Sequence, residues 1–145
     1  MNASSSDFTK ALAGPRHHDD RLLGGNGADT LRGGFGDGRL FGGPGNDNLQ
    51  PDDGLDILTF QANNGTDTIW GFDGGATLFA EDKIKLNGYG AFFGFDDLTF
   101  TETLVGDSIV DLGLQINGDG TILDRGEIVV KDTTGLTALD FVFQA

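Results

Sequence analysis

Leucine recurs every nine residues through the first part of the chain, at Leu22, Leu31, Leu40, Leu49 and Leu58. An aspartate stands two residues before four of these leucines, at Asp20, Asp29, Asp47 and Asp56. A period of nine is too short for a pair of helices, and it is neither a heptad nor a collagen triplet. The pattern therefore predicts a β-helix-like coil of short strands.

Each repeat divides into a glycine-rich half and an apolar half. Residues 24–59 read GGNGADTLR, GGFGDGRLF, GGPGNDNLQ and PDDGLDILT. The glycines predict a tight turn, and the last three residues predict a strand whose leucine points inward. Two such repeats close one turn of a flattened right-handed roll with two parallel sheets, and successive turns stack about 4.8 Å apart.

The pattern changes after Thr59, where large apolar side chains replace the single leucine per repeat. Alternation of apolar and polar residues predicts strands over 82–86, 107–112 and 126–130. We predict three parts: a disordered leader over residues 1–14, a roll over 15–59, and an antiparallel β cap over 60–145. The fold class is all-β, and the cap covers the open end of the roll.

Composition excludes several function classes. The chain of 145 residues has a net charge of −14, carried by 20 Asp and 3 Glu, and it has no cysteine. Disulfides and thiolate metal sites are therefore ruled out. We expect no nucleic-acid partner because a strongly acidic chain repels polyanions. No run of 18 apolar residues occurs, so we also expect no membrane insertion.

The aspartates indicate a metal. Asp29 and Asp47 are two repeats apart, so the roll places them in adjacent turns on one edge. At that spacing, and with an effective dielectric of about 20, the two charges repel by roughly 3 kcal/mol. Carboxylates and glycine-turn carbonyls are hard oxygen donors, and the repeats from residue 24 onward contain no histidine. These donors favour Ca²⁺ over zinc or copper.

These repeats resemble the RTX (repeats-in-toxin) nonapeptide G-G-x-G-x-D-x-U-x, in which U is a large apolar residue, found in proteins exported by bacterial type I secretion systems. The resemblance covers roughly residues 15 to 145 and implies Ca²⁺ held between turns. In the family, carbonyls of repeat positions two and four and the Asp of one turn join carbonyls of positions one and three and the Asp of the turn two repeats later. The best site carried over in this way is Gly25, Gly27 and Asp29 with Gly42, Pro44 and Asp47.

The resemblance implies three further sites that depart from the family pattern. On the same edge, a two-residue bulge would let Gly43, Gly45 and Asp47 share an ion with Asn64 and Asp67. On the opposite edge the sites are His18 and Asp20 with Gly33 and Phe35, and Gly34 and Gly36 with Pro51, Asp53 and Asp56. Position 38 on that edge is glycine, so each of its sites lacks one carboxylate. We expect both to be weak or empty unless Asp37 swings in.

The C-terminal segment, with Leu139, Asp140, Phe141, Val142 and Phe143, resembles the family's secretion region. It also has the apolar pattern of a strand that closes the core of the cap. The resemblance implies a secreted bacterial module that crosses a type I transporter unfolded and folds on Ca²⁺ outside the cell. The alternative is a Ca²⁺-dependent module that binds a polysaccharide or a cell surface.

No catalytic constellation supports an enzyme. The only histidines, His17 and His18, are adjacent in a predicted loop. The sequence around Ser108, VGDS, resembles a lipase-like serine motif, but no histidine follows it to act as the base. Residues 115–126 resemble an EF-hand loop but lack its final acid, which favours a hairpin turn. The twelve Phe residues, Trp70 and Tyr89 could form an aromatic surface on which a sugar stacks, although packing in the core is favoured.

Overall fold

The computed structural model describes residues 2–3, 10–12, 19–61, 64–73, 82–87, 98–102, 106, 108–111, 114–116, 122–124, 126–133 and 136–144. The strands within them are β1 (Asn2–Ala3), β2 (Lys10–Leu12), β3 (Arg21–Leu23), β4 (Thr30–Arg32), β5 (Arg39–Phe41), β6 (Asn48–Gln50), β7 (Ile57–Gln61), β8 (Thr66–Ile69), β9 (Lys83–Asn87), β10 (Thr99–Glu102), β11 (Ser108–Asp111), β12 (Leu114–Ile116), β13 (Ile122–Asp124), β14 (Glu127–Val130) and β15 (Phe141–Gln144). A 3₁₀ turn, η2 (Ala138–Asp140), precedes β15.

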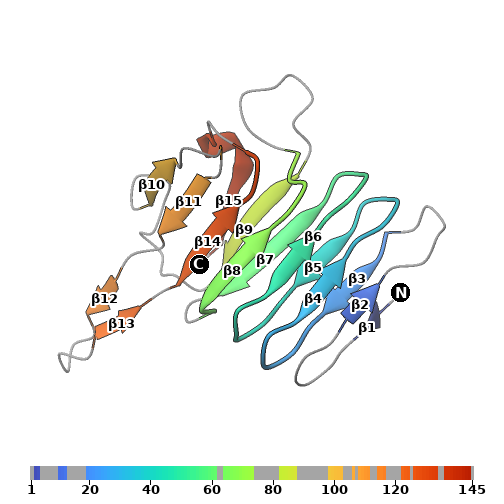
Figure 1. Ribbon diagram of the computed structural model, residues 1–145, viewed down its shortest axis with the longest axis horizontal. Coiled ribbons are helices and arrows are strands. Elements are labelled where there is room, and N and C mark those ends of the chain that lie inside the picture. The colour runs from blue at the N-terminus through green and yellow to red at the C-terminus, as the bar shows by residue number, and fades with distance from the viewer. Residues whose placement is uncertain are drawn as a thin grey trace.

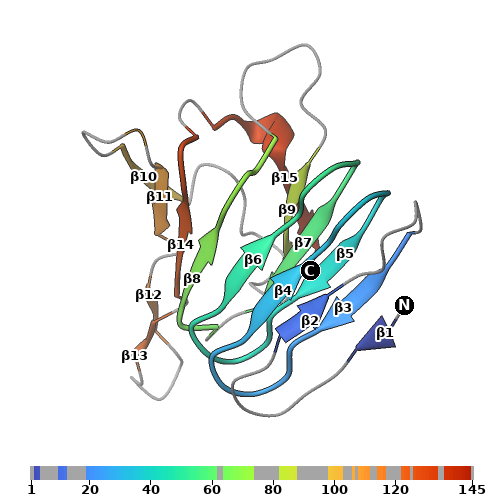
Figure 2. The same cartoon turned by 45° about the vertical axis from the view of Figure 1, so that its right-hand side comes forward.

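From β1 to β9, consecutive strands alternate between two facing sheets (Figures 1 and 2), and β12 and β13 form a separate two-stranded sheet. The first sheet has the order β1-β3-β5-β7-β9-β15, and the second has the order β10-β11-β14-β8-β6-β4-β2. Neighbouring strands in the repeat region are parallel, and their residues pair with those two repeats later, as Leu22 with Leu40 and Leu31 with Leu49. The predicted all-β fold with a parallel roll is confirmed.

The leucines of the repeat form the core between the sheets. Leu22, Leu31, Leu40, Leu49 and Leu58 have no exposed surface, and β8 and β9 continue the same rows with Ile69 and Ile84. Because side chains alternate along a strand, the residues on either side of each leucine face outward. Full burial of each leucine stabilises the roll by roughly 1.5–3 kcal/mol.

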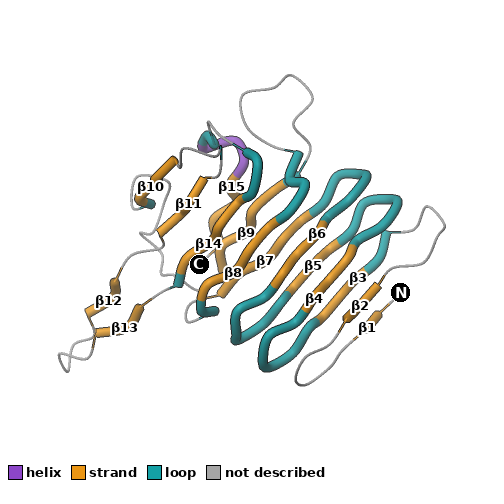
Figure 3. Tube along the Cα trace, viewed as in Figure 1, coloured by secondary structure: helices purple, strands orange, loops and turns teal. Residues whose placement is uncertain are grey.

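Glycine is required where the turns of adjacent coils touch (Figure 3). Gly43 and Gly45 have φ of 107° and 147°, which side chains rarely adopt. A Cβ at either position would also collide with the carbonyl of Gly25 or Gly27 in the preceding coil. The glycine half of the repeat therefore lets backbones stack at strand spacing.

Residues 1–14, expected to be a disordered leader, contribute two short strands to the roll. β1 pairs in parallel with β3, and β2 pairs in parallel with β4. The expectation is therefore wrong for residues 2–3 and 10–12. Backbone pairing to an open strand does not require the glycine and leucine of the repeat, so the pattern could not reveal it. The remaining domain division stays a prediction.

The region after Thr59 contains both parallel and antiparallel pairs. Parallel stacking continues through β7, β9 and β15 in the first sheet, and through β6, β8 and β14 in the second. Antiparallel pairs join β10 to β11, β11 to β14, and β12 to β13. The predicted antiparallel cap is therefore found in β10, β11 and β14, whereas β8, β9 and β15 continue the parallel pairing of the roll. Larger side chains, such as Phe60, fit inside the extended roll.

The C-terminal strand closes one end of the first sheet. Phe141 and Phe143 pair with Ile84 and Leu86, Phe141 is buried, and Phe143 packs against the core. Leu139 is 80% exposed, so the expectation that it helps to close the core is wrong. Asp140 is buried and accepts hydrogen bonds from Thr137, which caps η2. The described residues contain no helix of the length and apolarity that a membrane crossing needs.

Candidate metal centre

The turns that lead from the first sheet to the second lie one above another, and we call them the first edge. They comprise residues 24–29, 42–47 and, after a longer β7, 64–65. Gly25 N donates to Gly42 O, and Gly27 N donates to Pro44 O, each at 2.9 Å. The structure therefore brings together the six residues of the best predicted site.

The aspartates of the first edge form a ladder. Asp29 N donates to Oδ1 of Asp47 at 2.8 Å, and Asp47 N donates to Oδ1 of Asp67 at 2.9 Å. All three aspartates are buried. The second carboxylate oxygen of Asp47, Oδ2, is buried without a hydrogen-bond partner among the described residues. An orphaned carboxylate oxygen of this kind is a suitable ligand for a hard cation.

A proline leaves a second oxygen open on this edge. On the opposite edge, Asp53 N donates to Gly34 O at 3.0 Å. The equivalent residue on the first edge is Pro44, which has no N–H, and Gly25 O has no donor among the described residues. Gly25 O and Asp47 Oδ2 are thus unsatisfied acceptors in the same pair of coils.

Burial makes these carboxylates costly to ionise without a cation. It raises the pKa of Asp47 to about 6 and the pKa of Asp67 to about 7. The backbone N–H that donates to each carboxylate lowers the pKa, whereas the neighbouring aspartate charge raises it. Burial is the larger effect in both. The edge therefore favours either protons or a positive ion.

The second predicted site on this edge is also assembled. Gly45 N donates to Asn64 O at 2.8 Å, and Asn64 Nδ2 donates to Oδ2 of Asp67 at 3.3 Å. The additional residues are accommodated before β8, because Leu49 pairs with Ile69 and not with Asp67, which the strict repeat would place opposite it. Both oxygens of Asp67 accept hydrogen bonds, so this site is better satisfied than the first.

The turns leading back to the first sheet, which we call the second edge, differ from the first edge at Gly38, which supplies no carboxylate. Asp37 is exposed, and its Oδ1 accepts from Leu55 N at 3.0 Å, so it does not swing in. Gly36 N donates to Asp53 O, and Gly38 N donates to Oδ1 of Asp56. The other predicted site on this edge combined His18 and Asp20 with Gly33 and Phe35. His18 lies outside the described residues, Gly33 N donates to Gln50 O, and Phe35 forms a β-bridge with Asp53.

Comparison with known proteins identifies these turns. A family model described as the RTX calcium-binding nonapeptide repeat matches residues 18–58 and 59–75, with four copies. Over these residues the chain is similar to the RTX calcium-binding nonapeptide repeat. A solved structure also matches, the solution structure of the AlgE6R3 subunit from the Azotobacter vinelandii mannuronan C5-epimerase. It is 23% identical, covers 91% of this chain and 78% of its own, and has a TM-score of 0.36. No curated protein matches the chain.

The residues present fit the calcium ion that RTX repeats bind. The donor set on the first edge is all oxygen, and it includes the orphaned Oδ2 of Asp47 and the open carbonyl of Gly25. Among the described residues no three acidic or histidine side chains cluster closely enough to hold a metal by themselves. A calcium ion held here would therefore need backbone carbonyls as well as the paired aspartates.

The repeat pattern missed one member of the second edge, Asp82. Its Oδ1 accepts from Asp56 N at 3.0 Å, and its Oδ2 accepts from Asp73 N at 2.8 Å. It is fully buried, and burial raises its pKa to about 6. Asp82 stands two residues before the buried Ile84, as Asp56 stands two residues before Leu58. This spacing of two residues between an aspartate and a buried side chain is the sequence signal that could have identified Asp82 as a member of the second edge.

Proposed function

We propose that this chain is a calcium-dependent folding module of a bacterial protein exported by a type I transporter. The chain crosses the transporter unfolded, because the calcium-free aspartate ladder disfavours the roll at neutral pH. Outside the cell, calcium then stabilises the roll. Bound calcium would supply positive charge between the aspartates and accept lone pairs from the unsatisfied oxygens.

One observation carries the proposal, namely the buried Oδ2 of Asp47 beside a carboxylate ladder that is in register between coils. Gly25, Gly27, Asp29, Gly42, Pro44 and Asp47 would hold the first ion, and Gly43, Gly45, Asp47, Asn64 and Asp67 would hold the second. Gly34, Gly36, Asp53 and Asp56 form a weaker site because Gly38 supplies no carboxylate. Leu139 to Phe143 would be read as the secretion signal before folding.

The proposed role is not enzymatic. In the roll the leucines pack in the core, and the aspartates form hydrogen bonds along its edges. Extracellular calcium modules have dissociation constants of about 10⁻⁴ to 10⁻³ M, which fits a switch between the low calcium inside a cell and the higher calcium outside. The module would thus act after export, as a folded, secreted protein.

A second candidate function is calcium-dependent binding of a polysaccharide or a cell surface. It is favoured by the outer face of the first sheet, which carries cations although the chain is strongly acidic. This function is compatible with the first, because the binding face and the calcium edges are different surfaces of the roll.

The primary proposal is tested by comparing Asp47→Ala with Asp37→Ala in calcium titrations followed by calorimetry and circular dichroism. Asp47 belongs to both sites of the first edge, whereas Asp37 is exposed and its carboxylate accepts from only one exposed amide. We expect Asp47→Ala to raise the calcium midpoint at least tenfold and Asp37→Ala to leave it nearly unchanged. Equal shifts would contradict the pairing of the first edge.

A further inference from the structure

The outer face of the first sheet is defined by the outward side chains of β3, β5, β7, β9 and β15. It contains four of the nine Lys and Arg residues of the chain, namely Arg21, Arg39, Lys83 and Lys85. It contains none of the 23 Asp and Glu residues, since its other members are Leu23, Phe41, Ile57, Thr59, Gln61, Asn87, Val142 and Gln144. A face that was only solvated would carry acids in proportion to the rest of the chain.

The cations lie in rows across the strands. Arg21 pairs in register with Arg39 on the next strand, and Ile57 and Lys83 continue that row. Further along the same strands, Leu23 pairs with Phe41, and Thr59 pairs with Lys85. Neighbouring strands are about 4.8 Å apart, so the positive charges are distributed along the roll axis.

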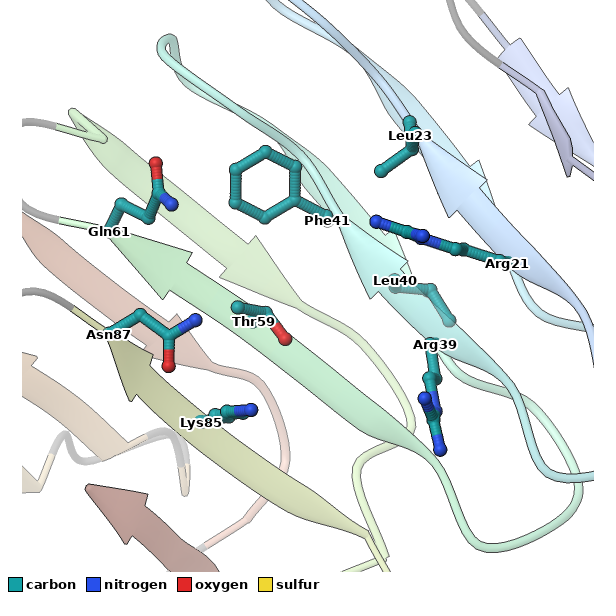
Figure 4. A pocket seen from close by; sticks show the side chains of 9 residues that line it. All are labelled: Arg21, Leu23, Arg39, Leu40, Phe41, Thr59, Gln61, Lys85 and Asn87. Atoms are coloured by element: carbon teal, nitrogen blue, oxygen red, sulfur yellow. The ribbon is translucent and has the colours of Figure 1, made fainter. Parts of the chain in front are cut away.

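This face is hollowed. A cavity of about 540 Å³ is lined by Arg21, Arg39, Phe41, Thr59, Gln61, Lys85 and Asn87, with Leu23 and Leu40 completing it. Figure 4 shows these side chains over β3, β5, β7 and β9. The hollow combines cations, hydroxyl and amide groups, and one aromatic ring. These are the groups that recognise a charged sugar, through ion pairs, hydroxyl contacts and stacking.

The cations of the hollow are available to a ligand. Arg21, Arg39 and Lys85 have no carboxylate partner among the described residues, although Asp19 and Asp37 lie near the two arginines at the adjoining second edge. Arg32 on the opposite sheet differs, because it forms an ion pair with Asp52 at 2.8 Å. The free charge on this face is therefore complementary to an anion.

We propose that the outer face of the first sheet binds a linear polysaccharide that carries one carboxylate per sugar, a polyuronate. This deepens the second candidate function. An extended polyuronate lying across the strands can present its carboxylates to the cations of β3, β5 and β9, while β7 offers Thr59 and Gln61 to its hydroxyl groups. The planar arginine groups pair well with carboxylates. Nucleic acid has a much higher charge density and would be repelled by the aspartates of the flanking edges.

The test is calorimetric binding of a galacturonate hexamer to the calcium-folded chain, with a neutral hexasaccharide of glucose, a sulfated hexasaccharide, a DNA hexamer and vesicles of anionic lipid as comparison ligands. We expect the galacturonate hexamer to bind more tightly than each of these. We expect Arg39→Gln/Lys85→Gln to lower its affinity at least tenfold. The matched control, Arg32→Gln/Lys131→Gln, removes the same charges from the opposite side of the roll and should leave the affinity within twofold.

Calcium midpoints measured by circular dichroism show whether each variant folds. If Arg39→Gln/Lys85→Gln does not fold, Arg21→Gln/Arg39→Gln, which changes two exposed side chains, replaces it. Absence of binding, equal losses in the two double variants, or tighter binding of DNA, lipid or the sulfated sugar would overturn the proposal. A chain that folds on calcium but does not bind the uronate would refute this inference and leave the folding proposal intact.

Discussion

The backbone amide of Asp56 donates a hydrogen bond to the carboxylate of Asp82, which lies far beyond it in the chain. The same carboxylate also accepts from Asp73 N, so one buried side chain joins the second edge to the segment before β9. The aspartate contacts of the second edge thus extend from the leucine repeats to Asp82, which precedes β9.

Replacing Asp82 should destabilise the folded chain. In Asp82→Ala, two buried or half-buried amides lose their acceptor, and each unsatisfied donor costs about 1–3 kcal/mol. We expect a loss of about 2–5 kcal/mol in urea unfolding at saturating calcium. Asp73→Ala is the control, because it keeps the backbone N–H that binds Asp82. Similar stability of Asp82→Ala and Asp73→Ala would show that the contact contributes little.

Pro44→Ala should weaken calcium binding. The substitution restores an N–H that can donate to Gly25 O, as Asp53 N donates to Gly34 O on the second edge. In the folded roll this N–H would compete with the ion for Gly25 O, and a competing hydrogen bond worth about 1 kcal/mol would lower the affinity of the folded roll for calcium roughly fivefold. Pro51→Ala, which removes a proline from the other edge, controls for the general loss of rigidity. Equal calcium midpoints for the two variants in calorimetry would contradict this role of Pro44.

Acid should stabilise the roll when calcium is absent. Burial raises the pKa values of Asp47 and Asp82 to about 6 and those of Asp56 and Asp67 to about 7, against an ordinary value of 3.8. The folded state therefore binds more protons than the unfolded state between about pH 4 and pH 7, and its stability falls as pH rises through that range. In excess chelator, far-UV circular dichroism should show more β structure at pH 4.5 than at pH 7.5. The opposite order would contradict the burial of these carboxylates.

Two residues near the C-terminus separate its structural role from its predicted role in export. Phe141 is buried, so Phe141→Ala should cost about 3–5 kcal/mol in urea unfolding with calcium present. Leu139 is 80% exposed, so Leu139→Ala should leave stability within about 0.5 kcal/mol. If the segment is a secretion signal read on the unfolded chain, Leu139→Ala should still reduce export through a reconstituted type I transporter. Normal export of Leu139→Ala would remove the support for Leu139 in that signal.

The repeat region could be predicted from the sequence because its period is strict. The leucines at their spacing of nine all lie in the core, Asp29, Asp47 and Asp56 take part in the hydrogen bonds of the edges, and the glycines mark the turns. The two extra residues before Asp67 could also be anticipated, because D-T-I preserves the order of carboxylate and inward side chain.

The remaining elements could not be read from the period. Asp82 continues the second edge after an insertion, and the length of an insertion does not tell which turn a later carboxylate joins. β15 pairs with β9, a distant strand in the sequence, with Phe141 opposite Ile84, and an apolar strand pattern does not specify its partner. Exposure of Leu139 follows from its place in the η2 turn, whose cap uses Asp140, and alternation alone predicts the wrong side.

The most direct test of the account is a calcium titration of the intact chain at pH 7.5, followed by far-UV circular dichroism. Buried, mutually repelling aspartates and ten glycines between Gly24 and Gly45 make the roll unstable without a cation. We expect a largely unfolded spectrum in excess chelator and a cooperative gain of β structure with a midpoint of about 10⁻⁴ to 10⁻³ M calcium. The same β content in chelator and in millimolar calcium would contradict calcium-dependent folding.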